Sequence, residues 1–177
     1  MTELGARVAA KVSVPTDPRT LFTALCDAMS ERRGGRPVTL IRRAFPETMA
    51  DITGLWLDVK DQDVIVIEDS LSPDHQLVVL GHELWHMHAG HCGHDLGGAA
   101  VAARAALSDE VQWPELARLI AARSHSGHED EVDAEGFGLL VASRMAGWLA
   151  APGAPRLDGV ARRIGASLGY TGAQGSP

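Results

Sequence analysis

Residues 72–90 read SPDHQLVVLGHELWHMHAG, and this stretch decides the fold that the sequence predicts. Ser72 is a favourable helix cap, Pro73 suits the first helical position, and Asp74 suits the positive end of the helix dipole. Apolar residues then follow at helical spacing and give the helix a buried side: Leu77, Val78, Leu80 and Leu84. The helix should end near Gly90, because glycine readily adopts the left-handed conformation that terminates helices.

The segment His82-Glu83-Leu84-Trp85-His86 within this helix predicts a zinc site. Positions i and i+4 lie on one helix face, so His82 and His86 can present two imidazole nitrogens to one ion. Glu83 lies about 100° further round the helix, near enough to reach a metal-bound water without being a ligand. Zinc lowers the pKa of such a water, and Glu83 can then act as general base in attack on a carbonyl.

A third protein ligand is expected, because a catalytic zinc site uses three ligands and leaves the fourth position for water. The acidic segment 129–135 supplies the candidates. Phe137 and Leu140 follow Asp133 at helical spacing, so we expect Asp133 on the buried face and take it as the first candidate. Glu129 lies one turn earlier on the same face, and Glu131 remains a further alternative.

A different arrangement, the metzincin pattern, would place a third histidine ten residues after His82 and a glycine seven after it. Those positions hold Cys92 and Ala89, so the pattern fails. Cys92 is expected to be a small buried residue rather than a ligand. We expect the other nearby histidines at the helix end and on the surface: His88, His91 and His94.

The rest of the pattern predicts an α+β fold, mainly helical, with a small three-stranded sheet packed on the motif helix. Strands are expected at 38–41, 54–59 and 64–67, with a hairpin turn at 60–63. Helices are expected at 18–33, 114–123, 128–150 and 157–168. We divide the chain into a flexible leader at 1–17, a single domain at 18–168 and a disordered tail at 169–177.

Composition excludes several classes of protein. The formal net charge of −7 argues against a phosphate-binding surface, so no direct nucleic-acid partner is expected. No signal peptide precedes residue 18, no stretch is long and apolar enough to span a membrane, and two cysteines make no disulfide framework. We therefore expect a cytoplasmic protein without membrane contact.

The segment 81–91, together with Asp133-Ala134-Glu135-Gly136-Phe137, resembles the ImmA/IrrE family of zinc metallopeptidases, and in particular its small actinobacterial members described as toxin components. The resemblance covers about residues 20–145 and implies a zincin-like fold and Zn²⁺-dependent cleavage of a partner protein, possibly a helix-turn-helix regulator. The family has glutamate where this chain has Asp133, and usually glycine where it has Trp85. Zincins commonly stabilise the oxyanion with Tyr or His, a role that His125 or His128 would take here.

Three functions follow as hypotheses. The first is a zinc metallopeptidase that cuts a partner regulatory protein. The second is a zinc-stabilised sensor or binding module of a toxin–antitoxin or regulatory pair with little hydrolysis. The third is a zinc enzyme acting on a small molecule or short peptide in a biosynthetic pathway, because a fold does not fix the class of substrate.

Overall fold

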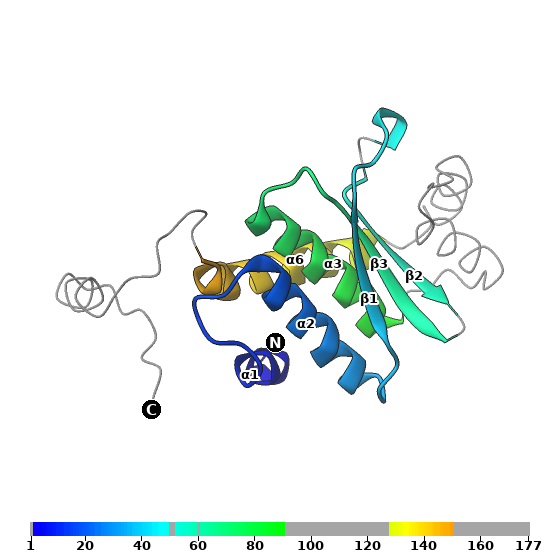
Figure 1. The fold of residues 1–177 in the computed structure, drawn as a ribbon. Coiled ribbons are helices and arrows are strands. Elements are labelled where there is room, and N and C mark those ends of the chain that lie inside the picture. The colour runs from blue at the N-terminus through cyan, green and yellow to red at the C-terminus, as the bar shows by residue number, and fades with distance from the viewer. Residues whose placement is uncertain (1, 50–51, 60, 91–127, 151–177) are drawn as a thin grey trace, which may run out of the picture.

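The computed structural model describes residues 2–49, 52–59, 61–90 and 128–150 (Figure 1). These residues form an α+β structure with four helices and a three-stranded mixed sheet. In chain order the elements are α1 (Thr2–Ala9), α2 (Pro18–Arg32), β1 (Val38–Arg43), β2 (Gly54–Val59), β3 (Gln62–Glu68), α3 (Pro73–Ala89) and α6 (His128–Met145), with 3₁₀ turns at Glu47–Met49 and Ala146–Trp148. The three expected strands are all present.

The sheet has the order β1-β3-β2, so the last strand in the sequence lies in the middle. β2 and β3 form the expected antiparallel hairpin, in which Val59 pairs with Gln62. β1 runs parallel to β3 on the other side. The middle of this central strand is a run of four apolar residues, Val64 to Ile67, which have no exposed surface. Such a continuous apolar run is typical of a strand covered on both faces.

The helices lie to one side of the sheet, where α2 contacts β1 and α3 contacts β2 and β3 (Figure 1). α2 begins where the sequence predicts, because the Asp17 carboxylate accepts a hydrogen bond from the Thr20 N–H at 3.0 Å. Ser72 caps α3 in the same way, and Gly90 ends it with a φ of 74°. Apolar residues of α2, α3 and the sheet form one core, which includes Phe22, Leu25, Trp56, Ile65, Leu80 and Leu84.

The expectation of a flexible leader at 1–17 is wrong for the residues that the structure describes. Residues 2–9 form α1, whose Leu4 and Val8 are buried in the core. Glu31 of α2 also pairs with Arg7 at 3.0 Å and with Lys11 at 2.7 Å. Two apolar residues one turn apart are a weak sequence signal, and their burial depends on packing against α2.

Helix α6 begins at the predicted residue and ends earlier than predicted, since residues 146–148 form a 3₁₀ turn. The expected helices at 114–123 and 157–168 and the tail at 169–177 lie outside the described residues. No helix in the described part of the chain is long and apolar enough to cross a membrane.

Candidate metal centre

The two motif histidines converge on one point beside α3. Their Nε2 atoms lie 3.0 Å apart, and their rings meet edge to face with centroids 4.6 Å apart. Both side chains are partly buried, with 23% of His82 and 12% of His86 exposed. Each ring is therefore mostly enclosed by the protein and partly accessible to solvent.

Glu131, in the first turn of α6, completes the group. Its Oε2 atom lies 3.5 Å from the Nε2 of His82 and 3.7 Å from the Nε2 of His86. The ligand atoms of the three residues all lie within 4.8 Å of one another. Two imidazoles and a carboxylate are a donor set that zinc uses in hydrolytic enzymes.

The spacing of these atoms fits a single small cation. An ion about 2.0–2.1 Å from each ligand in a tetrahedron would hold the ligand atoms about 3.3 Å apart. The three observed separations, 3.0, 3.5 and 3.7 Å, lie on both sides of that value. His82, His86 and Glu131 could therefore hold a metal ion, with only small movements of the side chains.

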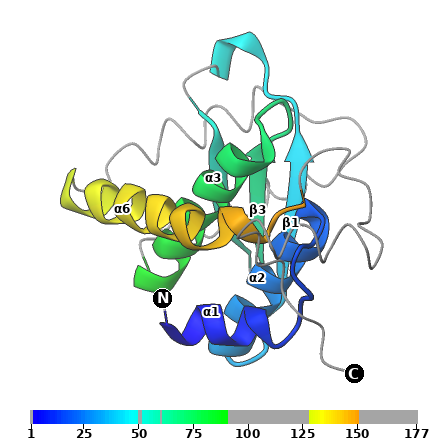
Figure 2. The ribbon, with the colours of Figure 1, turned by 90° about the vertical axis from the view of Figure 1, so that its left-hand side faces the viewer.

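Two glycines bring α6 close enough to α3 to supply Glu131. A β-carbon at Gly138 would lie 2.5 Å from the backbone oxygen of Val78 and 3.2 Å from the backbone nitrogen of His82. A β-carbon at Gly81 would lie 2.9 Å from the Cα of Gly138. The two helices cross at this contact (Figure 2). Larger side chains at either position would separate the two sources of ligands.

The first candidate for the third ligand, Asp133, is not in this group. Its side chain is exposed, as is that of Glu129. The buried face of α6 instead consists of Ala134, Gly138, Val141 and Met145. Glu131 precedes Ala134 by three residues and so lies on that face, whereas Asp133 is displaced by about 100°. The prediction relied on Phe137 and Leu140, but Leu140 is exposed and Phe137 only partly buried, whereas Gly138 lies directly against the backbone of α3.

Glu83 is buried, with 7% of its surface exposed, and lies between α3 and the start of β2. A β-carbon at Gly54 would lie 2.8 Å from the Oε1 atom of Glu83. The glycine at the beginning of β2 therefore provides the space for this carboxylate. Glu83 is not among the residues whose ligand atoms converge.

The protonation state of His82 favours metal binding. Burial lowers the pKa of His82 below its ordinary value, although the charges of Glu131 and Glu135 oppose this change. The neutral imidazole is the form that ligates a metal. The protein environment therefore reduces the competition between protons and a metal ion at this ring.

Trp85 occupies the motif position directly before His86 and packs against Phe137 and His88. Its ring centroid lies 5.3 Å from that of Phe137 and 5.8 Å from that of His88. It therefore reinforces the contact between α3 and α6. His91, Cys92, His94 and His125 lie outside the described residues, as does the side chain of His128.

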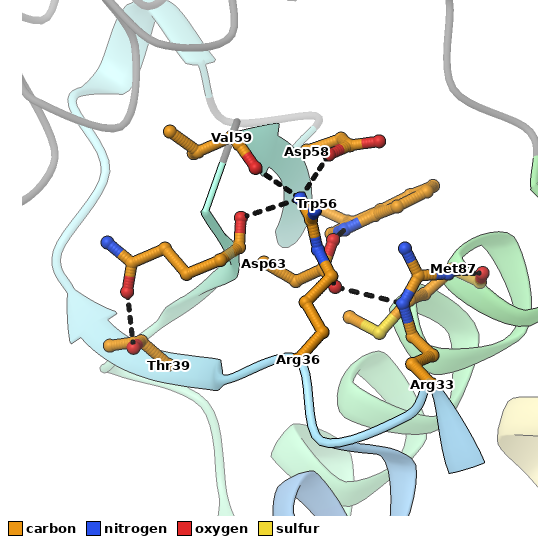
Figure 3. Close-up of polar contacts among 9 residues, drawn as sticks. Arg33, Arg36, Thr39, Trp56, Asp58, Val59, Asp63 and Met87 are labelled. Atoms are coloured by element: carbon orange, nitrogen blue, oxygen red, sulfur yellow. Dashed lines mark hydrogen bonds and ion pairs between the residues drawn. The ribbon is translucent and has the colours of Figure 1, made fainter. Parts of the chain in front are cut away.

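An ionic network around the buried Asp63, which the sequence did not predict, anchors the end of α3 (Figure 3). Asp63 has no exposed surface, and its carboxylate accepts a hydrogen bond from the Trp56 Nε1 at 3.0 Å. The Nε atoms of Arg33 and Arg36 each lie 2.9 Å from its Oδ2. Arg33 also donates to the carbonyl of Met87 at 2.8 Å, one residue after His86.

The local pattern identified Asp63 only as a residue of the hairpin turn. Its role depends on two arginines that the fold brings to it from the end of α2 and the residues before β1. A buried charge requires such partners, because an unpaired carboxylate loses its hydration on burial. The sequence feature that could have indicated this role is the position of Asp63, a charged residue directly before a run of apolar strand residues.

Comparison with known proteins found no matching protein-family model, no matching curated protein and no matching solved structure.

Proposed function

We propose that this protein is a zinc-dependent peptidase that hydrolyses a peptide bond in a partner protein. The observation that carries the proposal is the convergence of the His82, His86 and Glu131 ligand atoms, with separations of 3.0–3.7 Å. The buried carboxylate of Glu83, next in sequence to His82, supports a hydrolytic role rather than a purely structural one. The resemblance of residues 81–91 to ImmA/IrrE metallopeptidases makes a regulatory protein the first partner to test.

Each residue has a distinct role in this proposal. A bound zinc ion would supply Lewis acidity toward a water molecule and toward the carbonyl that is attacked. His82, His86 and Glu131 would hold the ion. Glu83 takes the proton from the attacking water and can deliver it to the leaving amine, which is the work of a general acid–base catalyst.

The test separates the ligands from the base. Glu83→Gln should keep zinc, measured by metal analysis after dialysis, and should lose about 10²–10⁴-fold in cleavage rate. Glu131→Ala should lose zinc affinity by more than the roughly 10–100-fold typical of groups that only orient a ligand. Asp133→Ala is the matched control and should keep both. Cleavage products are identified by mass spectrometry on a library of peptides from a bacterial proteome.

Two results would contradict the proposal. Equal cleavage by the wild type and by Glu83→Gln would show that the activity does not come from this site. Loss of zinc in Asp133→Ala with zinc retained in Glu131→Ala would show that the ligand set is wrong.

A second candidate is a zinc-stabilised sensor or binding module. The described residues include no tyrosine, and none of them is identified as a donor to a developing oxyanion. Removing one such donor typically costs about 3 kcal/mol of transition-state stabilisation. Stoichiometric zinc binding without cleavage of any peptide, together with loss of the cellular phenotype in His82→Ala but not in Glu83→Gln, would favour this alternative.

A further inference from the structure

The outer edge of β1 carries backbone groups that have no partner in the described part of the chain. The Pro37 carbonyl accepts the Asp63 N–H at 2.8 Å, and the Arg43 carbonyl accepts the Asp69 N–H at 3.0 Å. In a strand, the N–H and C=O groups of alternate residues point to opposite sides. Odd-numbered residues of β1 therefore bond to β3, and Val38, Leu40 and Arg42 direct their backbone groups away from it.

A groove runs along this edge, between β1 and the first turns of α2. It has a volume of about 480 Å³. Its lining consists of Arg19, Phe22 and Thr23 from α2, the four consecutive residues Leu40 to Arg43, and Asp69 after β3. Successive strand residues point to opposite faces of the sheet. Because four consecutive residues line the groove, it lies along the outer edge of β1, beside the backbone groups that point away from β3. Both ribbon views place α2 beside β1 (Figures 1 and 2).

The groove is positively charged in a protein whose net charge is −7. Three guanidinium groups, from Arg19, Arg42 and Arg43, line it with one carboxylate, that of Asp69. Arg19 and Arg42 form no ion pair with any described residue. The charge of this groove therefore opposes that of the molecule as a whole and favours an acidic ligand.

We propose that this groove binds an acidic, extended segment of a partner protein, which adds to the sheet as a strand beside β1. The backbone groups of Val38, Leu40 and Arg42 would pair with the segment. Its acidic side chains would lie on the face that α2 covers, toward Arg19 and Arg42, and its apolar side chains would lie on the opposite face, beside Ile41. Strand addition of this kind obtains affinity from the main chain and specificity from alternate side chains. The inference does not depend on the proposed catalytic function.

The test measures binding of a fluorescent peptide, Glu-Val-Glu-Val-Glu-Val with blocked ends, to the full chain by fluorescence anisotropy. Arg19→Glu and Arg42→Glu should each weaken binding about tenfold. Arg144→Glu changes the net charge equally on an exposed part of α6 and should leave the affinity unchanged. Circular dichroism and thermal unfolding of each variant check that the fold is intact.

Two modified peptides test strand pairing without changing the protein. N-methylation of every valine or of every glutamate removes the N–H donors on one side of the strand only. One of the two peptides should bind as the parent does, and the other should lose binding. Equal binding by both would overturn the pairing, and equal effects of Arg42→Glu and Arg144→Glu would overturn the location. Displacement of the peptide by inorganic phosphate more strongly than by chloride at equal ionic strength would indicate a small-anion site instead.

Discussion

Replacement of Gly138 by alanine tests whether a close helix contact holds the candidate metal centre together. The added β-carbon would lie 2.5 Å from the Val78 carbonyl oxygen, whereas an ordinary carbon–oxygen contact is about 3.3–3.6 Å. The neighbouring atoms belong to the backbone of α3, so relief requires α6 to move by about 1 Å. Overpacking of this kind costs about 3 kcal/mol at its upper end, and the better helix propensity of alanine offsets about 1 kcal/mol.

The net expectation for Gly138→Ala is a loss of about 2 kcal/mol in the free energy of unfolding, equivalent to about 4–8 °C in Tm. Urea and thermal denaturation of the zinc-free protein measure this loss. Gly136 is the matched control, because a β-carbon there meets nothing within 4 Å. Gly136→Ala should therefore stabilise the protein by up to about 1 kcal/mol.

The same substitution should weaken zinc binding. A displacement of α6 by about 1 Å would move Glu131 relative to the two histidines by more than the roughly 0.2 Å that metal–ligand distances tolerate. Competition with a chromogenic chelator measures the affinity, which should fall for Gly138→Ala and stay constant for Gly136→Ala. A Gly138→Ala protein with wild-type stability and wild-type zinc affinity would refute the role assigned to the helix crossing.

Three further predictions concern ionisable side chains. Asp63→Asn should lower the free energy of unfolding by about 3 kcal/mol in urea, since two arginines would lose a buried partner, whereas the exposed Asp61→Asn should change it by less than about 0.5 kcal/mol. Burial raises the pKa of Glu68, but hydrogen bonds from neighbouring N–H groups outweigh this effect and lower that pKa below 4.5. The carboxylate therefore contributes stability above pH 4.5, and this contribution is lost as the pH falls through the pKa of the folded state. In Glu68→Gln the free energy of unfolding should depend less on pH between about pH 5 and 3. Burial raises the pKa of Cys26 to about 12, so in a Cys92→Ser background native protein should resist iodoacetamide at pH 8 while urea-unfolded protein reacts; rapid labelling of the native form would contradict the burial.

Local signals in the sequence predicted α3, the helix that carries two of the three candidate ligands. The Ser72 cap, Pro73 and Gly90 act within a few residues of one another, and the structure confirms both ends of α3. The hairpin of β2 and β3 was also predicted, because its turn and its apolar strands are adjacent in the chain. Such features depend on interactions between residues that are close in the chain, so they can be predicted from a single sequence.

The features that the sequence did not predict depend on contacts between distant segments. Glu131 rather than Asp133 faces the histidines because α6 rotates to place Ala134 and Gly138 against α3. Glycine and alanine at a helix crossing contribute little to a hydrophobic pattern. A prediction based on large apolar residues therefore assigns the wrong face of α6 to the buried side. The burial of α1 likewise depends on packing against α2.

The strand order has a consequence for the sequence of events in folding. Partners in the hairpin are as close as Val59 and Gln62, whereas every pair between β1 and β3 is separated by 25 residues, as are Val38 and Asp63. Because closing a longer loop costs more chain entropy, the hairpin is expected to form first and β1 to join it later. Until then the apolar β3 has an open edge, which invites aggregation. Arg36, just before β1, forms ion pairs with Asp58 and Asp63 of the hairpin. These ion pairs would shorten the time for which the edge of β3 is exposed during folding.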